Sequence, residues 1–200
     1  MQVLNKTVFY GIMVKNGESG RIMLKKYYPY EYAESVFTID YQKLLDMGYR
    51  AVIFDIDNTL VHHGDGSTPE VDALFRQLHE MGLKTLLLSN NNEERVQMFL
   101  ENIDSPYIHL ANKPDPAGYL KALEILEVEK SQAIMVGDQV FTDILGANRC
   151  GMASILVKFI RLPGKIKIGK RRRVEKIILK FYFGSKSSRN RLGGICLKER

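Results

Sequence analysis

An α/β fold, with a parallel sheet and helices on both of its faces, is the architecture that the sequence predicts. Between residues 50 and 157, short apolar runs alternate with amphipathic segments, which is typical of βαβ units around a parallel sheet. Each apolar run is bounded by polar or turn residues, as buried parallel strands are. At 200 residues the chain is long enough for one such domain with a substantial core, but short for two.

The expected elements follow one another regularly along the chain. A helical element at Tyr30–Met47 leads into the first strand. Strands are predicted at Ala51–Ile56, Thr85–Leu88, Ile108–Ala111, Ala133–Val136 and Ala153–Val157. Helices are predicted at Pro69–Met81, Asn92–Asn102, Pro116–Glu127 and Val140–Cys150. Proline at two of the helix starts and glycine after two of the helix ends support these boundaries.

Charge divides the chain into an acidic body and a basic end. Residues 161–200 carry 14 Lys or Arg against two acids, a net charge of +12, whereas residues 1–160 carry 15 basic and 21 acidic groups, a net charge of −6. We therefore expect a flexible N-terminal extension over 1–24, an α/β domain over 25–160 and a basic tail over 161–200. The tail can be read as a surface for an anionic partner, RNA or lipid, or as a solvated extension.

Within this tail, apolar residues fall at helical spacing beside basic residues between Arg171 and Tyr182, which predicts a basic amphipathic helix. The last dozen residues are rich in Ser, Arg and Gly, so we expect them to be disordered.

Composition narrows the class of protein further. No apolar run approaches the roughly 20 residues needed to cross a bilayer, so an integral membrane protein is not expected. The two cysteines, Cys150 and Cys196, lie in regions of different character and predict neither a disulfide framework nor a metal cluster. The expected location is the cytoplasm, with peripheral attachment to a membrane as a variant.

Polar side chains gather where four consecutive predicted strands end. In chain order they are Asp55, Asp57, Ser89, Asn90, Lys113, Asp138 and Asp143. Ligands of an open parallel sheet bind outside the carboxyl ends of its strands. We therefore expect these residues to form one site.

The order Asp-x-Asp-x-Thr, Ser, Lys and Gly-Asp-x-x-x-x-Asp resembles all four motifs of the haloacid dehalogenase (HAD) superfamily over roughly residues 50–157. Further matches are Tyr28-Pro29, the run Phe54–Val61, Ser89–Asn91 and Asn112–Pro114. Together they resemble the capless subfamily IIIA phosphatases of the YqeG-like group, which is similar to phosphatidylglycerophosphate phosphatases. The resemblance implies a HAD-type Rossmann-like parallel sheet, a phosphatase domain over 25–160 and bound Mg²⁺.

Spacing between the motifs leaves no room for a cap domain. Asp57 and Ser89 are 32 positions apart and Ser89 and Lys113 are 24 apart, and the predicted helices and strands use most of both gaps. The stretch Val61–Thr68 can form only a flap beside an open site, in which His62 and His63 are expected to be solvated. A large or exposed substrate is therefore predicted.

The residue types suit phosphomonoester hydrolysis. Asp55 can attack phosphorus and form an aspartyl-phosphate, which splits one difficult displacement into two easier ones. As a second carboxylate, Asp57 can protonate the leaving alcohol and then activate water. This second acid favours a phosphatase or phosphomutase within the superfamily, and the missing cap counts against the mutase.

The remaining residues are assigned to the metal and the phosphate. Mg²⁺ prefers hard oxygen ligands. The expected metal ligands are the Asp55 carboxylate, the Asp57 main-chain carbonyl and Asp138, with Asp143 supporting the shell. The expected phosphate contacts are Ser89, Asn90 and Lys113, of which the lysine supplies a positive charge.

Two functions remain open at this point. The first is a magnesium-dependent phosphatase acting on a large substrate, such as a phospholipid phosphate. The second is an interaction protein on a HAD scaffold, whose basic tail docks RNA, ribosomal particles or a membrane. The intact motif set favours the first. Because the motifs end by Asp143 and the last strand by Val157, we expect the tail after Leu162 to be dispensable for chemistry.

Overall fold

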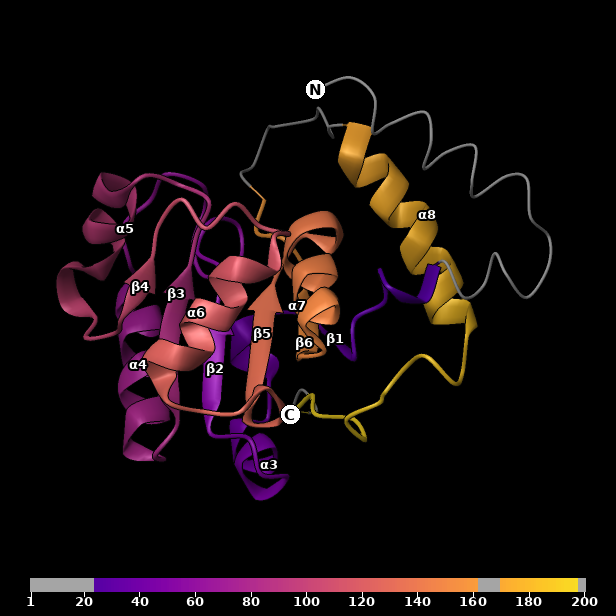
Figure 1. Cartoon of the computed structure of the whole chain (residues 1–200), viewed down its shortest axis with the longest axis horizontal. Helices are drawn as coiled ribbons and strands as arrows, with labels where there is room; N and C mark the ends of the chain where they lie inside the picture. Colours follow the sequence, from indigo (N-terminus) through magenta and orange to yellow (C-terminus); the bar gives the residue numbers. More distant parts are fainter. Residues whose placement is uncertain (1–23, 162–169, 198–200) are drawn as a thin grey trace.

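A six-stranded parallel sheet forms the centre of the computed structural model, which describes residues 24–161 and 170–197. The spatial order of the strands is β1-β6-β5-β2-β3-β4 (Figure 1). The strands are β1 (Glu31–Ala33), β2 (Ala51–Phe54), β3 (Lys84–Leu88), β4 (Tyr107–Ile108), β5 (Ala133–Gly137) and β6 (Ala153–Val157). This confirms the predicted α/β fold, whereas the flexible extension expected over 1–24 lies outside the described residues except for residue 24.

Helices connect these strands. The α-helices are α3 (Tyr41–Asp46), α4 (Pro69–Glu80), α5 (Glu93–Phe99), α6 (Pro116–Leu126), α7 (Leu145–Cys150) and α8 (Lys170–Gly184). Shorter turns are η1 (Val36–Thr38), η2 (Leu100–Asn102), η3 (Lys130–Gln132) and η4 (Val140–Ile144), the last a π-helical turn. The side chains of Thr68 and Asp115 cap α4 and α6, and proline follows each cap. Local sequence therefore fixes where these two helices begin.

Both faces of the sheet are covered, which explains why the strands are apolar throughout. Alternate residues of β2 point to opposite sides. Val52 and Phe54 lie in the core shared with α3, α4 and α5, whereas Ala51 and Ile53 lie in the core shared with α6 and α7. Each face thus has its own hydrophobic core, and the carboxyl edge of the strands is left for polar side chains.

The segment Tyr30–Met47 is not the single helical element that the sequence predicted. It contains the strand β1, the turn η1 and the six-residue helix α3. β1 pairs in parallel with β6, and the Tyr30 amide donates to the Ser154 carbonyl at 2.8 Å. A three-residue strand is too short to show a period of two, so only its pairing with a distant strand identifies it.

The basic amphipathic helix predicted within the tail is confirmed as α8. Its buried side chains are Glu175, Ile178 and Tyr182, whereas Ile177 and Phe181 are exposed. The two buried apolar residues pack with Val140 and Ile144 of η4, among others, in a third hydrophobic cluster. Among the described residues, no helix has both the length and the apolar character required to span a membrane.

Residues 185–197 pack against the domain, contrary to the disorder expected from the composition of the chain end, of which residues 198–200 lie outside the described residues. Leu192 and Ile195 are buried in the hydrophobic core that also contains residues of α3 and α4. The Asp40 amide donates to the Ile195 carbonyl at 2.7 Å, and the Leu192 amide donates to the buried Glu31 carboxylate at 3.2 Å. Removing the chain after Leu162 would therefore uncover apolar core, which argues against the expected dispensability of the tail.

Candidate active site

The register of the sheet brings the polar strand ends together. Phe54, the last residue of β2, is paired with Leu87 of β3 on one side and Val136 of β5 on the other. Asp55 directly follows this central strand, and its amide donates to the Val136 carbonyl at 3.0 Å. The site predicted at the carboxyl edge therefore has Asp55 at its centre.

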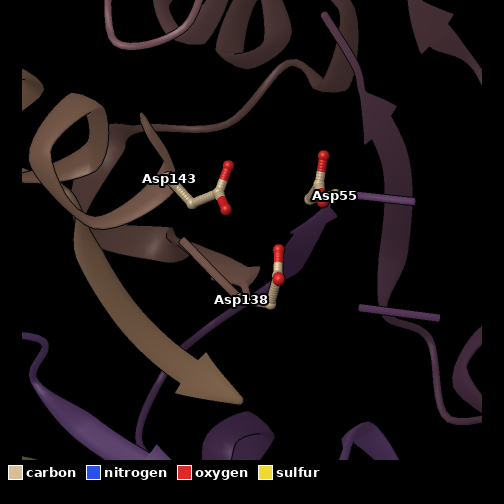
Figure 2. Close-up of side chains that lie close together, drawn as sticks. All are labelled: Asp55, Asp138 and Asp143. Atoms are coloured by element: carbon tan, nitrogen blue, oxygen red, sulfur yellow. The ribbon is translucent and has the colours of Figure 1, made fainter. Parts of the chain in front are cut away.

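Three of the predicted acids form a compact cluster. Asp55, Asp138 and Asp143 each place a carboxylate oxygen within 4.8 Å of the others, and all three residues are buried (Figure 2). Gly137 permits this approach, because a Cβ atom at that position would lie only 2.5 Å from the Asp143 side chain. The glycine of the fourth motif is thus a steric requirement of the cluster.

Lys113 neutralises part of this cluster. Its Nζ lies 2.6 Å from Asp55 Oδ1 and 2.8 Å from Asp143 Oδ1, and its side chain is 2% exposed. Burial opposes the charged form, but the two carboxylates outweigh burial and raise the pKa of Lys113. The lysine is therefore a permanent cation next to the expected nucleophile.

Asn90, one of the expected phosphate contacts, also has a structural role. Its Oδ1 accepts from the Lys113 amide at 2.6 Å, and its Nδ2 donates to the Lys113 carbonyl at 3.1 Å. Both polar atoms of the side chain thus hold the backbone of Lys113. Asn90 fixes the position of the cation, a role that could not be read from the sequence.

The acid cluster fits a divalent cation. Burial raises the pKa of Asp55 to about 6 and that of Asp138 to about 8, because charged carboxylates there lack sufficient compensation. Asp143 Oδ1 is buried, and it contacts the ammonium of Lys113 at 2.8 Å. Three buried acids with one shared cation form an oxygen-only set of the kind that binds hard divalent cations.

Asp57 lies outside this cluster of carboxylates. Arg95 Nη2 donates to its Oδ1 at 2.7 Å, and Asn91 Nδ2 donates to its Oδ2. His63 Nδ1 also lies 3.1 Å from that oxygen, although the histidine side chain is 71% exposed, as expected of a flap residue. Burial opposes the charged form, but the Arg95 bond, the Gly64 amide and nearby positive charge hold the pKa of Asp57 below its usual range. Asn91 lies within the matched run Ser89–Asn91 but was given no role, and Arg95 was missed because it falls at no motif position.

Two hydroxyl groups complete the described surroundings. Ser89 is buried and its Oγ accepts from the amide and the side chain of Asn91, both at 3.1 Å, so its own proton remains free to donate. Thr59 Oγ1 donates to Asp55 Oδ2 at 3.1 Å and lies 3.4 Å from Asp138 Oδ1. Thr59 therefore links the expected nucleophile to an expected metal ligand.

A further charged residue comes from the tail. The Arg172 guanidinium of α8 donates to both the carboxylate and the main-chain oxygen of Asp138. No motif marks Arg172, which follows Asp138 by 34 residues. The sequence gave no signal for this contact, because it depends on how α8 packs.

Comparison with known proteins agrees with this fold. The haloacid dehalogenase-like hydrolase family matches residues 62–151. The probable phosphatase YqeG of Bacillus subtilis is 39% identical over 137 residues, which are 68% of this chain and 80% of that protein. The chain therefore belongs to the haloacid dehalogenase-like hydrolases.

Within that family the relatives are phosphatases, and we identify this chain as a HAD-family phosphatase. The glyceraldehyde 3-phosphate phosphatase of Pyrococcus abyssi is 27% identical over 100 residues, 46% of this chain and 42% of that protein. Among solved structures, NagD from Escherichia coli K-12 has a TM-score of 0.49 at 15% identity, covering 62% of this chain and 94% of that chain.

Proposed function

We propose that the protein is a Mg²⁺-dependent phosphomonoester hydrolase that acts through an aspartyl-phosphate on Asp55. The observation that carries this proposal is the position of Asp55, which lies in a buried cluster with two further acids and accepts a hydrogen bond from Lys113 Nζ at 2.6 Å. Hydrogen bonds from Lys113 and Thr59 fix the orientation of the Asp55 carboxylate. Asp55, Asp138 and Asp143, with the main-chain oxygen of Asp57, are the proposed ligands of Mg²⁺.

The first half-reaction transfers the phosphoryl group to the protein. The Asp55 carboxylate attacks phosphorus, the bond to the ester oxygen breaks, and the leaving alcohol takes a proton from Asp57. Lys113 and the Ser89 hydroxyl stabilise charge on the phosphoryl oxygens. When bound, Mg²⁺ supplies further neutralisation of the negative charge that the nucleophile and the phosphate bring together.

The second half-reaction restores the protein. Asp57, now ionised, accepts a proton from water as the water oxygen attacks phosphorus, and the bond to Asp55 breaks to release phosphate. The lowered pKa of Asp57 in the free protein favours the ionised carboxylate that this step requires. For its action as an acid in the first half, the arriving phosphate dianion raises that pKa by like-charge repulsion.

The proposed substrate is large or exposed, such as a phospholipid phosphate. Between the expected nucleophile and Ser89 the structure places only the flap, α4 and β3, and between Ser89 and Lys113 only α5, η2 and β4. Neither connection forms a cap over the site. A substrate chemically similar to phosphatidylglycerophosphate is proposed from the resemblance to that class of phosphatase.

The exposed side of α8 is proposed to contact an anionic surface. Arg173, Lys176 and Lys180 are exposed, and Ile177 and Phe181 are 40% and 51% exposed beside them. Basic residues mixed with exposed apolar ones suit a lipid surface better than RNA, since apolar side chains gain burial among acyl chains. Cosedimentation with anionic vesicles and with ribosomal particles, at low and high salt, separates these partners.

Hydrolysis measurements with and without metal test the proposed reaction. The protein is stripped with EDTA and assayed on an aryl phosphate and on micellar phosphatidylglycerophosphate, with Mg²⁺ added back. We expect turnover only with Mg²⁺, and acid quenching during turnover should yield a peptide containing Asp55 that is heavier by one phosphoryl group. Full activity in EDTA, or phosphate on another residue, contradicts the mechanism.

A further inference from the structure

We propose that Arg172 is a positioning residue of the metal site, which holds the outer oxygen of the Asp138 carboxylate and leaves the inner oxygen facing Asp55. The inference rests on the metal-dependent function proposed above. It makes the first turn of α8 part of the catalytic unit. The basic tail would then have a role inside the protein as well as on its surface.

Arg172 contacts Asp138 with both arms of its guanidinium. Nη2 donates to Asp138 Oδ2, and Nη1 donates to the main-chain oxygen of the same residue. Because the guanidinium is planar and rigid, two bonds to one residue fix the carboxylate relative to its own backbone. Lysine, with a single ammonium, cannot reproduce that pair of directions.

The other carboxylate oxygen remains on the side of the metal cluster. Asp138 Oδ1 lies 3.4 Å from Thr59 Oγ1, and the same hydroxyl donates to Asp55 Oδ2 at 3.1 Å. The two oxygens of Asp138 thus have separate partners, Arg172 on the outside and the cluster on the inside. If Arg172 competed with the metal, its guanidinium would bind the Asp138 oxygen that faces Asp55. It binds the other oxygen, which favours a role in positioning the Asp138 carboxylate.

Arg172 is itself held in place from two directions. Glu175 Oε2 accepts from Arg172 Nη1 at 3.0 Å, and the Phe159 ring centroid lies 4.8 Å from the guanidinium carbon. The arginine side chain is only 21% exposed. An exposed surface arginine samples many rotamers. The guanidinium of Arg172 is held in one orientation and can therefore fix the orientation of the Asp138 carboxylate.

Glu175 also connects α8 to the chain between the two acids. Its Oε1 accepts from the Val140 amide at 3.1 Å, at the start of the π-helical turn that carries Asp143. Ile178 and Tyr182 pack in the same hydrophobic cluster as Val140. The helix therefore holds the segment between Asp138 and Asp143 through an ion pair, a backbone hydrogen bond and apolar contacts.

Metal binding by full-length variants tests this role. Arg172→Met keeps the aliphatic stem but removes the guanidinium, and Arg172→Lys keeps the charge without the fork. Mg²⁺ affinity is measured by calorimetry and Mn²⁺ affinity by electron paramagnetic resonance. We expect Arg172→Met to weaken both by roughly 10- to 100-fold, the usual cost of losing a residue that orients a metal ligand, and Arg172→Lys to recover part of the loss.

Neighbouring arginines provide matched controls. Arg171→Met and Arg173→Met remove the same charge from exposed positions of the same helix turn, and their metal affinity should stay within about twofold of wild type, since exposed charges are well screened. Turnover of Arg172→Met should recover at saturating Mg²⁺. If Arg172→Met does not fold, Glu175→Gln replaces it, and we expect weaker metal binding there for the same reason.

The possible outcomes separate the inference from the proposed function. If wild type binds neither metal, the metal-dependent function is wrong and this inference with it. If wild type binds metal and Arg172→Met binds it equally well, Arg172 only packs α8 against the domain. Tighter binding by Arg172→Met would mean that the arginine competes with the metal. Either of the last two results overturns the positioning role alone.

Discussion

Lys113, which is buried, and Arg172, which is half-buried, are two cations that contact neighbouring acids in different ways. Lys113 presents one ammonium to two carboxylates, those of Asp55 and Asp143, from inside the cluster. Arg172 presents a fork to the outer side of a single residue, Asp138. The first arrangement supplies charge where the reaction needs it, and the second sets the direction of a ligand.

The two cations also reach the site by different routes. Lys113 follows β4 and is fixed by Asn90 at the end of the neighbouring strand, so the sheet alone determines its place. Arg172 arrives on a helix after the last strand and depends on side-chain packing. An active site can thus combine a cation that the sheet positions with a ligand that a later helix orients.

Removing the proposed nucleophile tests the reaction in which both cations are proposed to take part. Asp55→Asn cannot form an aspartyl-phosphate, so turnover should fall by on the order of 10⁶-fold, as when nucleophiles of other enzymes are removed. Hydrolysis of an aryl phosphate at saturating Mg²⁺ measures this, with circular dichroism to verify folding. Near-normal turnover in the folded variant contradicts the assignment of Asp55 as the nucleophile.

Removing the second acid separates chemistry from metal binding. Asp57→Asn should lose roughly 10²- to 10⁴-fold in turnover, the usual contribution of a general acid and base. Its Mg²⁺ affinity should be retained, because the Asp57 carboxylate lies outside the acid cluster and only its main chain is a proposed ligand. Calorimetry and turnover are compared on one preparation. Weak metal binding with normal turnover at saturating Mg²⁺ would reverse the assigned roles.

Replacing Lys113 tests how its role differs from that of Arg172. Lys113→Met removes charge from the reacting group, so kcat should fall by about 10²- to 10³-fold even at saturating Mg²⁺. Arg172→Met, by contrast, should regain turnover as metal is added. Lys121→Met, an exposed lysine on α6, is the matched control. If excess Mg²⁺ restores Lys113→Met and Arg172→Met equally, the two cations do not differ as proposed.

A third cation, Arg95, should influence the pH dependence of turnover. Its bond to Asp57 lowers the pKa of that carboxyl, so Arg95→Met raises it. Because the first half-reaction needs protonated Asp57 in the complex with substrate, the alkaline limb of the kcat profile should move to higher pH. Profiles of wild type, Arg95→Met and the exposed-site control Arg76→Met test this. A limb that stays in place, or moves to lower pH, contradicts the acid role of Asp57.

The strand ends were predictable in position and the contacts between them were not. Asp55, Asp138 and Asp143 were identified because a parallel sheet brings its carboxyl ends to one edge, and the structure brings these three together. Asn90 was expected near the phosphate, and the sequence did not indicate that its side chain holds the backbone of Lys113. A residue type at a strand end indicates that it lies near the site, and only coordinates show which atom it faces.

The C-terminal residues show the same limit on a larger scale. Composition predicted disorder for the last dozen residues, yet Ile195 is fully buried and Leu192 nearly so. Low average hydrophobicity does not prevent two apolar residues from filling an existing core, because the core offers them contacts that no local window reveals. β1 was missed for a related reason, since three residues form a strand only by pairing with β6.

The sequence by itself determined the parallel α/β architecture, the helix starts at Pro69 and Pro116 and the family of the chain. These features depend on periodicity, caps and motif order, which are local in sequence. Only the tertiary structure decided that Arg172 faces Asp138, that Arg95 holds Asp57 and that the C-terminal residues close the core. Such contacts join residues far apart in the chain, and their geometry follows from packing that no local pattern encodes.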